Sequence, residues 1–318
     1  MLLLDEAATR AALPMPALIE ALREMFAKGC VMPVRHHHGV DVPGEDNATL
    51  LLMPAWVPGE YLGVKIANVF PGNSARGLAA VNASYMLMSG RTGENLALLD
   101  GGELTARRTA AASALAADYL ARKDASHLLI VGTGRLAPNL VEAHSAVRPI
   151  SRISVWGRSR ENAEAVAAKI SVRGAKASAV TNLESAVGEA DIVSCATLSA
   201  DPLVHGAWLT PGAHLDLIGA FTPQMRESDD EAVLRASVFV DTRAGALKEG
   251  GDLAIPIASG KFDASKVRAE LSELARGEHP GRTSEDEVTL FKSVGAALED
   301  LAAAILAYRT VGSGKDAG

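Results

Sequence analysis

Apolar and polar positions follow different patterns in the two parts of the chain. After residue 121, short apolar runs alternate with stretches whose apolar residues recur at helical spacing; the runs are LLIVGTG, ISVWGR, ASAV, DIVSCAT, HLDLIGA and VFVD. Helices are expected over 137–147, 161–170 and 183–187. Apolar runs joined by helices are typical of strands buried on both faces of a parallel sheet. The pattern predicts an α/β domain with a doubly wound parallel sheet over residues 121–287.

The first 120 residues follow another pattern. A helix is expected over 16–28, and strand-like segments over 49–53, 61–69 and 80–88 are separated by turns with the sequences PGE, PGN and RTGE. Short segments joined by glycine-containing turns indicate a mainly antiparallel sheet. We therefore predict an α+β domain over residues 1–120.

Two alanine-rich segments complete the predicted organisation. Residues 105–122 are expected to form a helix that bridges the two domains. In the segment 288–318, a helix over about 288–310 is expected to return to the first domain. The tail from residue 312 on is expected to be disordered.

The first strand of the second domain ends in a glycine turn, Gly132-Thr133-Gly134, followed by Arg135, Leu136 and Ala137. The first glycine permits a sharp bend, the second lets a ligand approach the backbone, and the small alanine lets the next helix pack close to the strand. Free N–H groups at the start of such a helix bind phosphate oxygens. The motif, followed by a helix and a second strand, predicts Rossmann-type dinucleotide binding by residues 132–137.

The residues after the second strand bear on which dinucleotide binds. An NAD site usually has Asp or Glu about 20 residues past the glycines, bonded to the ribose 2′-hydroxyl. This chain has Arg158, Ser159 and Arg160 there. Two guanidinium groups and a hydroxyl suit a 2′-phosphate, and no carboxylate repels it. The sequence favours NADPH, with NADH possible; the alternative is a solvated loop with two surface arginines.

Composition limits the kinds of partner. The 318 residues are 48% hydrophobic, enough for a large core, and 31 basic against 38 acidic side chains give a net charge of −7. The absence of a basic run and the few aromatic residues argue against a nucleic-acid surface. The sequence has no apolar run of about 18 residues, no basic opening segment and only two distant cysteines. We expect a cytoplasmic protein, away from membranes, whose partners are small molecules and a second copy of itself.

Three consecutive histidines, His36, His37 and His38, invite a metal-site interpretation. Successive side chains on a strand point to opposite faces, so only two of them can converge, fewer than a zinc site uses. We therefore predict no metal site.

Three basic residues of the first domain, Arg35, Lys65 and Arg108, lie among apolar or small residues. Burying such a charge is costly without an anion. The ammonium group of Lys65 is expected on the same strand face as Gly63, which leaves room beside it. Arg107 and Arg108 are adjacent on a helix, so only one is expected to point inward. Together the three predict a pocket for a carboxylate; the alternative is that these long side chains extend to solvent.

Several segments, in this order, resemble the ornithine cyclodeaminase/mu-crystallin family: GVKIANVFPGN, TGENLALLDGGELTARRTAAASALAA, GTGRLAPNLVEAH, VWGRSRENAEAVA and DLIGAFTPQMRESDDEAV. The resemblance covers most of the chain. It implies a homodimer formed through the first domains and a nicotinamide cofactor bound between the first and second domains. It also implies that Arg35, Lys65 and Arg108 bind a substrate carboxylate, with Lys65 as a candidate catalytic acid or base.

One position separates the activities of that family. Ornithine cyclodeaminases carry an aspartate in a GGD segment, where this chain has GAF with Phe221. Phenylalanine can neither take a proton nor balance an ammonium group. The segment LIGAFTPQMRESDDEAV, with FVDTRAGALKEGGDL after it, resembles instead the reductases of Δ1-pyrroline-2-carboxylate and Δ1-piperideine-2-carboxylate. Phe221 is then expected to form an apolar wall for the substrate ring, and Lys65 to protonate the imine or hold the carboxylate.

The resemblance also implies further cofactor contacts, from Thr109 in the first domain, from Cys195, Ala196 and Thr197 at the end of a strand, and from Asp252, for which a turn residue is the alternative. The activity it favours is an NADPH-dependent ketimine reductase that makes L-proline and L-pipecolate. The alternatives are ornithine cyclodeaminase, alanine dehydrogenase, and a mu-crystallin-like protein that binds NADPH and small carboxylates without turnover.

Overall fold

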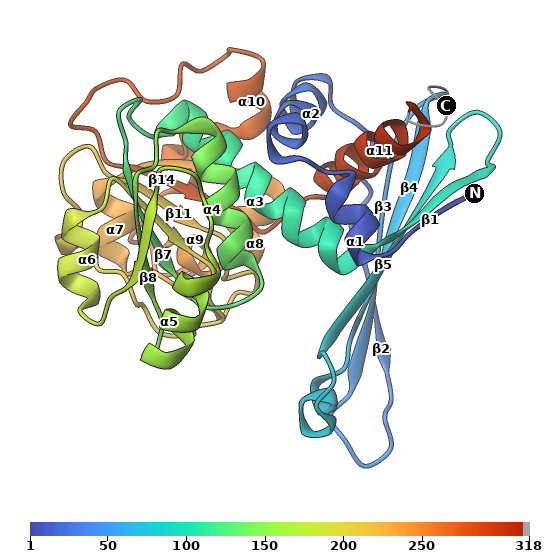
Figure 1. Cartoon of the computed structure of the whole chain (residues 1–318), viewed down its shortest axis with the longest axis horizontal. Coiled ribbons are helices and arrows are strands. Elements are labelled where there is room, and N and C mark those ends of the chain that lie inside the picture. Colours follow the sequence, from blue (N-terminus) through green and yellow to red (C-terminus); the bar gives the residue numbers. More distant parts are fainter. Residues whose placement is uncertain (314–318) are drawn as a thin grey trace. The chain divides into compact units, whose positions relative to one another are not determined.

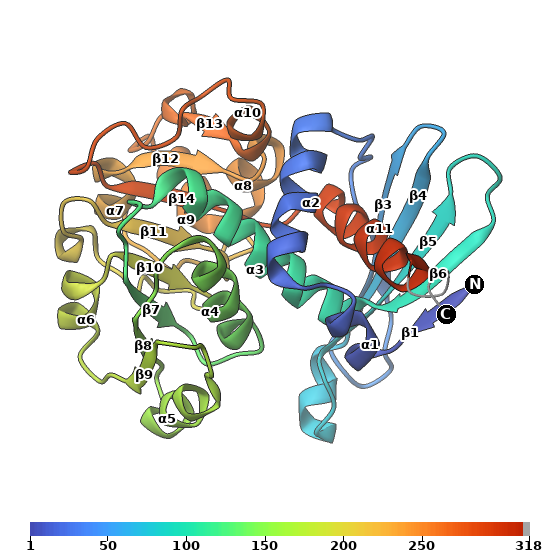
Figure 2. The same cartoon turned by 45° about the horizontal axis from the view of Figure 1, so that its top comes forward.

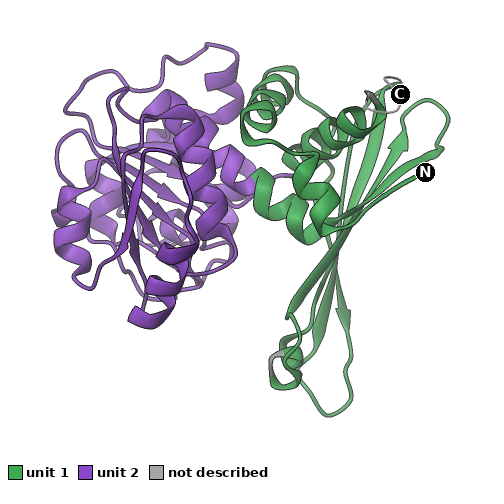
Figure 3. Cartoon of the chain, in the orientation of Figure 1, with its two compact units in different colours: residues 1–108, 297–318 green, residues 109–296 purple. Residues whose placement is uncertain are grey.

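The computed structural model describes residues 1–313 of the chain, drawn from two sides in Figures 1 and 2. Two compact units make up the fold (Figure 3): unit 1 comprises residues 1–108 and the chain from residue 297 on, and unit 2 comprises residues 109–296. The sequence placed these boundaries at 120 and 287 instead. Helix α3 (Gly101–Leu120) crosses the first boundary without a break, so no turn marks it. Within the described chain, no helix is both long and apolar enough to span a membrane.

Unit 1 contains a six-stranded sheet in the order β1-β6-β5-β4-β3-β2. Every neighbouring pair is antiparallel except β1 and β6, which confirms the mainly antiparallel first domain. Two of the predicted turns, PGE and RTGE, contain Gly59 with φ 74° and Gly93 with φ 75°, a conformation that favours glycine. The strands are β1 (Leu2–Leu4), β2 (His36–Val40), β3 (Ala48–Val57), β4 (Tyr61–Val69), β5 (Val81–Ser89) and β6 (Asn95–Asp100).

Helices of unit 1 cover one face of this sheet. Figure 2 shows α11 (Ala297–Ser313) lying across the strands beside α2 (Met15–Lys28), and α11 contacts α2 and strands β3 to β6. Helix α2 has a proline in its first turn and ends at Gly29, whose φ of 77° favours glycine. The shorter helices are α1 (Glu6–Ala11) and the 3₁₀ helix η1 (Pro71–Arg76).

Unit 2 contains an eight-stranded, entirely parallel sheet in the order β13-β12-β14-β11-β10-β7-β8-β9. The chain runs outward from β7 to β9, then returns and continues from β10 on the other side of β7. This is the doubly wound, Rossmann-type order that the apolar runs predicted. The strands are β7 (His127–Val131), β8 (Arg152–Trp156), β9 (Lys176–Ala179), β10 (Ile192–Cys195), β11 (His214–Leu217), β12 (Ser237–Val240), β13 (Ala269–Glu270) and β14 (Thr289–Lys292).

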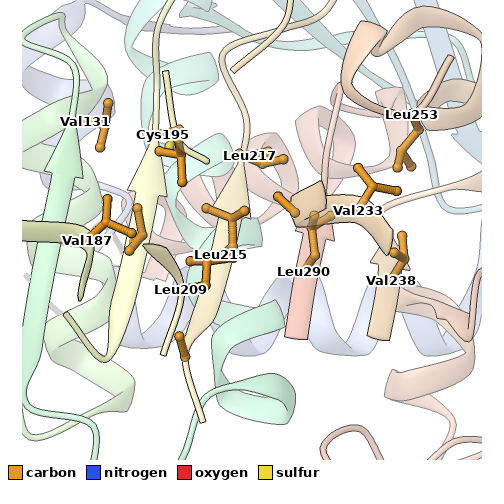
Figure 4. Packing of buried hydrophobic residues seen from close by; sticks show 14 of the residues in the cluster. Val131, Val187, Cys195, Leu209, Leu215, Leu217, Val233, Val238, Leu253 and Leu290 are labelled. Atoms are coloured by element: carbon orange, nitrogen blue, oxygen red, sulfur yellow. The ribbon is translucent and has the colours of Figure 1, made fainter. Parts of the chain in front are cut away.

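Helices lie on both faces of the parallel sheet, with α4 and α5 on one side and α6 and α7 on the other (Figure 1). A buried apolar cluster fills the second side, where strand residues such as Val131, Leu217 and Leu290 meet Val187 of α6 and Leu253 of α9 (Figure 4). The helices are α4 (Leu136–Val147), α5 (Arg160–Lys169), α6 (Leu183–Glu189), α7 (Asp230–Arg235), α8 (Arg243–Glu249), α9 (Gly251–Ala258) and α10 (Leu271–Ala275), with 3₁₀ turns η2 (Gly206–Trp208) and η3 (Ala264–Lys266).

The helix predicted over 288–310 is wrong in its first part. Thr289–Lys292 forms β14 in the middle of the parallel sheet, with every residue buried, and the helix begins only at Ala297. A segment of four residues is too short to show a helical or a strand period, and Gly295, with φ 80°, breaks the chain between β14 and α11. Residues 312 and 313 form the last turn of α11, and the rest of the predicted disordered tail, 314–318, lies outside the described residues.

Candidate functional site

The glycine turn of unit 2 has the backbone geometry that the motif predicts. Gly132 follows β7 with φ 129°, and a Cβ atom there would lie 2.6 Å from the carbonyl oxygen of Ala196, which follows β10. Only glycine fits this conformation and this space. Gly134 differs, because nothing lies within 4 Å of a Cβ built on it. Ala137 is buried in the first turn of α4. The turn is thus tight at Gly132 and open at Gly134, which suits a pyrophosphate that approaches the backbone.

The position of this turn in the sheet also fits dinucleotide binding. Strand β7 lies between β8 and β10, where the order of the strands reverses, and ligands of open α/β sheets bind outside the carboxyl ends of the strands at such a point. Ala196 and Thr197 follow β10 at the same edge, and both are partly exposed. Cys195 is different, since its side chain is part of the buried cluster shown in Figure 4. Cys195 can therefore offer a cofactor only backbone atoms.

The loop after β8 lies against the glycine turn, because a Cβ on Gly157 would be 2.6 Å from the Thr133 side chain. The three residues of this loop predicted to bind a 2′-phosphate differ in availability. Ser159 caps α5 by accepting a hydrogen bond from the backbone of Asn162. Arg160 is exposed and pairs with Glu164, Nε to Oε1 2.7 Å. Arg158 is exposed, and within residues 1–313 it has no ion-pair partner.

Two other predicted residues of unit 2 lie in contrasting surroundings. Phe221 is 47% exposed in the loop after β11. Asp252 is fully buried in α9, where its carboxylate accepts hydrogen bonds from the backbone of Glu227 and Ser228 and from Lys292. Both oxygens of Asp252 are engaged, so this carboxylate is not free to bind a cofactor, and it is not a turn residue either. Thr109 is partly exposed on α3.

Lys65 lies on the covered face of β4, as its strand position predicts. Residues at alternate positions of β4, including Gly63 and Lys65, are buried, whereas Ile66 is 37% exposed. The space beside Gly63 is not empty, because the hydroxyl of Tyr85 on β5 occupies the position that a Cβ would take. That hydroxyl is buried without a hydrogen-bond partner within the described chain. Burial raises the pKa of Tyr85, with a smaller contribution from Asp300.

The counter-charges of the buried cations come from α11. Lys65 Nζ lies 2.7 Å from Asp300 Oδ2, while Arg108 donates from Nε to Asp300 Oδ1 at 2.9 Å and from Nη1 to Glu299 Oε2 at 2.6 Å. All four side chains are at most 6% exposed. Arg108 Nη2 makes no hydrogen bond to a described residue. Two cations are therefore held by two adjacent carboxylates, and one edge of the Arg108 guanidinium is left for a ligand.

Burial and pairing act in opposite directions on the pKa values of this cluster. Burial lowers the pKa of Lys65 to about 8, although Asp300 raises it in part. Burial alone would raise the pKa of Asp300, but Arg108 and Lys65 outweigh it and the pKa is lowered. Asp300 is therefore an anion near neutral pH, and Lys65 exchanges its proton within the range in which enzymes work.

The expectation that only one of Arg107 and Arg108 points inward is wrong. Arg107 is 2% exposed and donates from Nε and Nη2 to the carbonyl oxygen of Leu13, at 3.0 and 2.7 Å. Both arginines are buried because α3 is enclosed by other parts of unit 1 at both positions. Arg35 lies immediately before β2, partly exposed.

Sequence reasoning missed Glu299 and Asp300. A signal was present, since GAALEDLAAA contains two adjacent acids in an otherwise apolar helix. Buried acids in such a helix require cationic partners, and the predicted buried cations required acids. The histidines lie on β2, all exposed, and within residues 1–313 no group of three His, Cys, Asp or Glu side chains could hold a metal ion.

Comparisons with known proteins agree with this geometry. The Δ1-pyrroline-2-carboxylate reductase of Paracoccus denitrificans is 43% identical over 284 residues, covering 89% of this chain and 88% of that protein. The structure of Thermococcus litoralis Δ1-pyrroline-2-carboxylate reductase in complex with NADH and L-proline has a TM-score of 0.92 at 34% identity, covering 99% of this chain and 98% of the other. An archaeal alanine dehydrogenase dimer with bound NAD has a TM-score of 0.89 at 31% identity, covering 99% and 97%.

The family expected from the sequence motifs is also matched directly. The model of the ornithine cyclodeaminase/mu-crystallin family covers residues 5–315, nearly the whole chain. The match includes the strand of Lys65, the helix of Arg108, the glycine turn and the acids of α11. The chain belongs to the ornithine cyclodeaminase/mu-crystallin family.

Proposed function

We propose that this chain catalyses the NADPH-dependent reduction of cyclic ketimine carboxylates, Δ1-pyrroline-2-carboxylate to L-proline and Δ1-piperideine-2-carboxylate to L-pipecolate. The observation that carries the proposal is the buried cluster of Lys65, Arg108, Glu299 and Asp300 in unit 1. The Paracoccus and Thermococcus relatives named as reductases of Δ1-pyrroline-2-carboxylate support the reaction class, an oxidoreductase acting on a carbon–nitrogen double bond.

Arg108 is proposed to bind the substrate carboxylate. Its Nε and Nη1 are fixed by Asp300 and Glu299, so the guanidinium plane has one orientation and Nη2 remains for a ligand oxygen. A guanidinium held by carboxylates in this way binds a further carboxylate with little loss of side-chain entropy. Arg35 and Lys65 are proposed to complete the binding of that carboxylate, as the sequence motifs imply.

Lys65 is also proposed to supply the proton. Reduction adds a hydride to C2 of the ring and a proton to the ring nitrogen, and protonation makes C2 a better hydride acceptor. An ammonium group whose pKa is about 8 gives up its proton more readily than an ordinary lysine. Asp300, at 2.7 Å, stabilises the ammonium and orients it. Phe221 is proposed to contact the methylene groups of the ring.

The bound dinucleotide supplies the hydride, and unit 2 is proposed to hold it. The turn over residues 132–137 would bind the pyrophosphate, and the segment 195–197, at the end of β10, would contact the ribose and nicotinamide. Arg158, exposed and unpaired among the described residues, is proposed to bind a 2′-phosphate, which favours NADPH. The related structures were solved with NADH or NAD, so the preference of this chain for NADPH requires its own measurement.

Loss of NADPH absorbance with Δ1-pyrroline-2-carboxylate tests the proposal, run beside NADH and beside L-ornithine with NAD. Rapid NADPH oxidation with formation of L-proline is expected. Formation of proline and ammonia from ornithine would overturn the proposal and favour ornithine cyclodeaminase. Phe221 would then not exclude that activity. Tight NADPH binding without turnover of either imine would favour a binding protein. Light scattering of the same sample tests the homodimer that we propose by analogy with the archaeal dimer.

A further inference from the structure

Three charged residues that take no part in the proposed reaction are buried together at the carboxyl edge of the parallel sheet. Glu227 lies in the loop after β11, Asp252 in the first turn of α9, and Lys292 at the end of β14. Each is fully buried. A charge buried this deeply requires strong hydrogen bonds, so the contacts of these three residues show what the cluster holds in place.

Glu227 joins the ends of two neighbouring strands. Its Oε1 accepts hydrogen bonds from the backbone N–H and the hydroxyl of Thr197, at 2.7 and 2.8 Å. Its Oε2 accepts from the backbone N–H of Gly219 at 2.7 Å and from that of Ala220 at 3.3 Å. Thr197 follows β10 and Gly219 follows β11. One carboxylate thus fixes both loops through backbone atoms.

Asp252 and Lys292 hold Glu227 itself. Asp252 Oδ1 accepts hydrogen bonds from the backbone N–H groups of Glu227 and Ser228, at 2.7 and 3.0 Å. Its Oδ2 accepts one from Lys292 Nζ at 2.9 Å. Lys292 is part of β14, which pairs with β11. The arrangement therefore extends from a central strand through α9 to the loop of Glu227.

Backbone contacts continue from Thr197 to the glycine turn. A Cβ on Gly219 would overlap the backbone of Thr197, and a Cβ on Gly132 would lie 2.6 Å from the carbonyl oxygen of Ala196. No side chain therefore separates Gly219 from Thr197 or Gly132 from Ala196. Ala196 and Thr197 are consecutive residues, so a displacement of Thr197 also displaces Ala196. Ala196 lies against the turn that is predicted to bind the pyrophosphate.

We propose that Glu227 is a positioning residue for the dinucleotide: by holding Thr197 and Gly219 it fixes Ala196 against Gly132 and keeps the cofactor site preformed. This inference rests on the proposed binding of a nicotinamide dinucleotide to unit 2. Glu227 acts through other residues, since its own carboxylate is buried and fully bonded. A preformed site binds more tightly because less ordering is required at the moment of binding.

The ionisation of Glu227 gives this role a second readout. Burial raises the pKa of Glu227 to about 7, with Lys292 of β14 lowering it and Asp252 of α9 raising it. Cys195 of β10 also interacts electrostatically with Glu227, and burial raises the pKa of that thiol. The carboxylate accepts from all its donors, whereas a protonated carboxyl turns one acceptor into a donor. The two loops are therefore held better above about pH 7 than below it.

Glu227→Gln tests the inference, with Glu231→Gln, at an exposed position of α7, as the matched control. Two quantities are measured: amide hydrogen exchange at Thr197, Gly219 and Ala220 in the cofactor-free protein, and the Kd values for NADPH and NADH from quenching of protein fluorescence. We expect protection to fall about tenfold at these amides and both Kd values to rise about tenfold in Glu227→Gln, with Glu231→Gln like the wild type.

The possible outcomes separate this inference from the proposed function. Reduced protection with unchanged Kd values, or no change in either quantity, overturns the positioning role. A wild-type protein that binds neither dinucleotide overturns the proposed function as well. If Glu227→Gln does not fold, amide hydrogen exchange of the wild-type protein still tests the inference. The protection factors of the wild-type amides at Thr197 and Gly219 should rise between about pH 6 and pH 8, and constant protection overturns the inference.

Discussion

Lys65 and Asp300, which lie far apart in the sequence, form a buried ion pair with 2.7 Å between Nζ and Oδ2. The pair joins β4 to α11, and Arg108 of α3 bonds the other oxygen of the same carboxylate. Three elements of unit 1 thus meet at Asp300.

Asp300→Asn should destabilise the protein strongly. The substitution leaves two buried cations with less counter-charge, and removing one partner of a buried pair costs about 3–5 kcal/mol. The lowered pKa of Asp300 means that its contribution is present above about pH 4 and is lost as the pH falls further. Urea unfolding at pH 7 and below pH 4 measures the free energy of unfolding of both proteins. The difference between the wild type and Asp300→Asn should be smaller below pH 4. Glu20→Gln, which removes an exposed ion pair with Arg23, is the control and should cost less than about 0.5 kcal/mol.

The rate of imine reduction should fall as the pH rises through about 8. The pKa of Lys65 is lowered mainly by burial, so the ammonium group that is proposed to donate the proton is present below that pH and lost above it. The dependence of kcat/KM on pH reports this group in the free enzyme. In Lys65→Arg, whose guanidinium stays charged, the fall near pH 8 should disappear. A fall that persists in this variant would show that another group, such as the imine itself, is titrating.

Lys65→Met should reduce kcat/KM by about a hundredfold or more, since general acid catalysis contributes about 10²–10⁴-fold. Methionine has a side chain of similar length to that of lysine but carries no charge. Steady-state kinetics with Δ1-pyrroline-2-carboxylate measure the effect, and the Kd for NADPH should be unchanged because Lys65 belongs to unit 1. A variant with normal kcat/KM would exclude Lys65 from the reaction.

Arg158→Gln should weaken NADPH binding about tenfold and leave NADH binding unchanged, because the proposed contact that it removes is a charge-assisted bond to the 2′-phosphate. Arg160→Gln is the matched comparison. Arg160 already pairs with Glu164, so its loss should have the smaller effect. Fluorescence titration of both variants with both dinucleotides measures the four Kd values. Equal weakening for NADPH and NADH would mean that Arg158 does not recognise the 2′-phosphate.

The two glycines of the turn should respond differently to alanine. Gly132→Ala places a Cβ 2.6 Å from the Ala196 carbonyl oxygen at a φ of 129°, so the protein should lose about 1–3 kcal/mol or more of stability. Gly134→Ala meets nothing within 4 Å and should melt like the wild type. It should nevertheless bind NADPH more weakly, since the methyl group would lie where the pyrophosphate is proposed to approach the backbone. Thermal melts with and without NADPH measure both effects; a stable Gly134→Ala with normal affinity contradicts this placement of the pyrophosphate.

Features that depend on residues close in sequence could be predicted well. The alternating burial of β4 placed Lys65 on the covered face, and the apolar run before Gly132 identified β7 and its turn. Both follow from a two-residue period or from local backbone conformation. Helices such as α2 and α5 were also found within about one residue, since proline, glycine or a serine cap marks their ends.

Features that depend on distant partners could not be predicted. Nothing near Lys65 or Arg108 in the sequence indicates that α11 supplies their carboxylates, although charge balance required acids from some part of the chain. Strand β14 was predicted to be part of a helix because its four residues are too few to show a distinct period. Asp252, which the family resemblance placed at the cofactor, is held instead by Lys292, and that lysine lies on the unrecognised strand.

Strand β1 has a practical consequence for work with this protein. Leu2–Leu4 pairs in parallel with Ala97–Leu99 at the edge of the sheet, and the hydroxyl of Thr9 bonds the Leu4 carbonyl oxygen. Deleting these first residues would expose the backbone hydrogen-bonding groups of β6, and an open apolar edge readily pairs with other chains. An affinity tag that disturbs the pairing of this strand with β6 therefore carries a risk of aggregation.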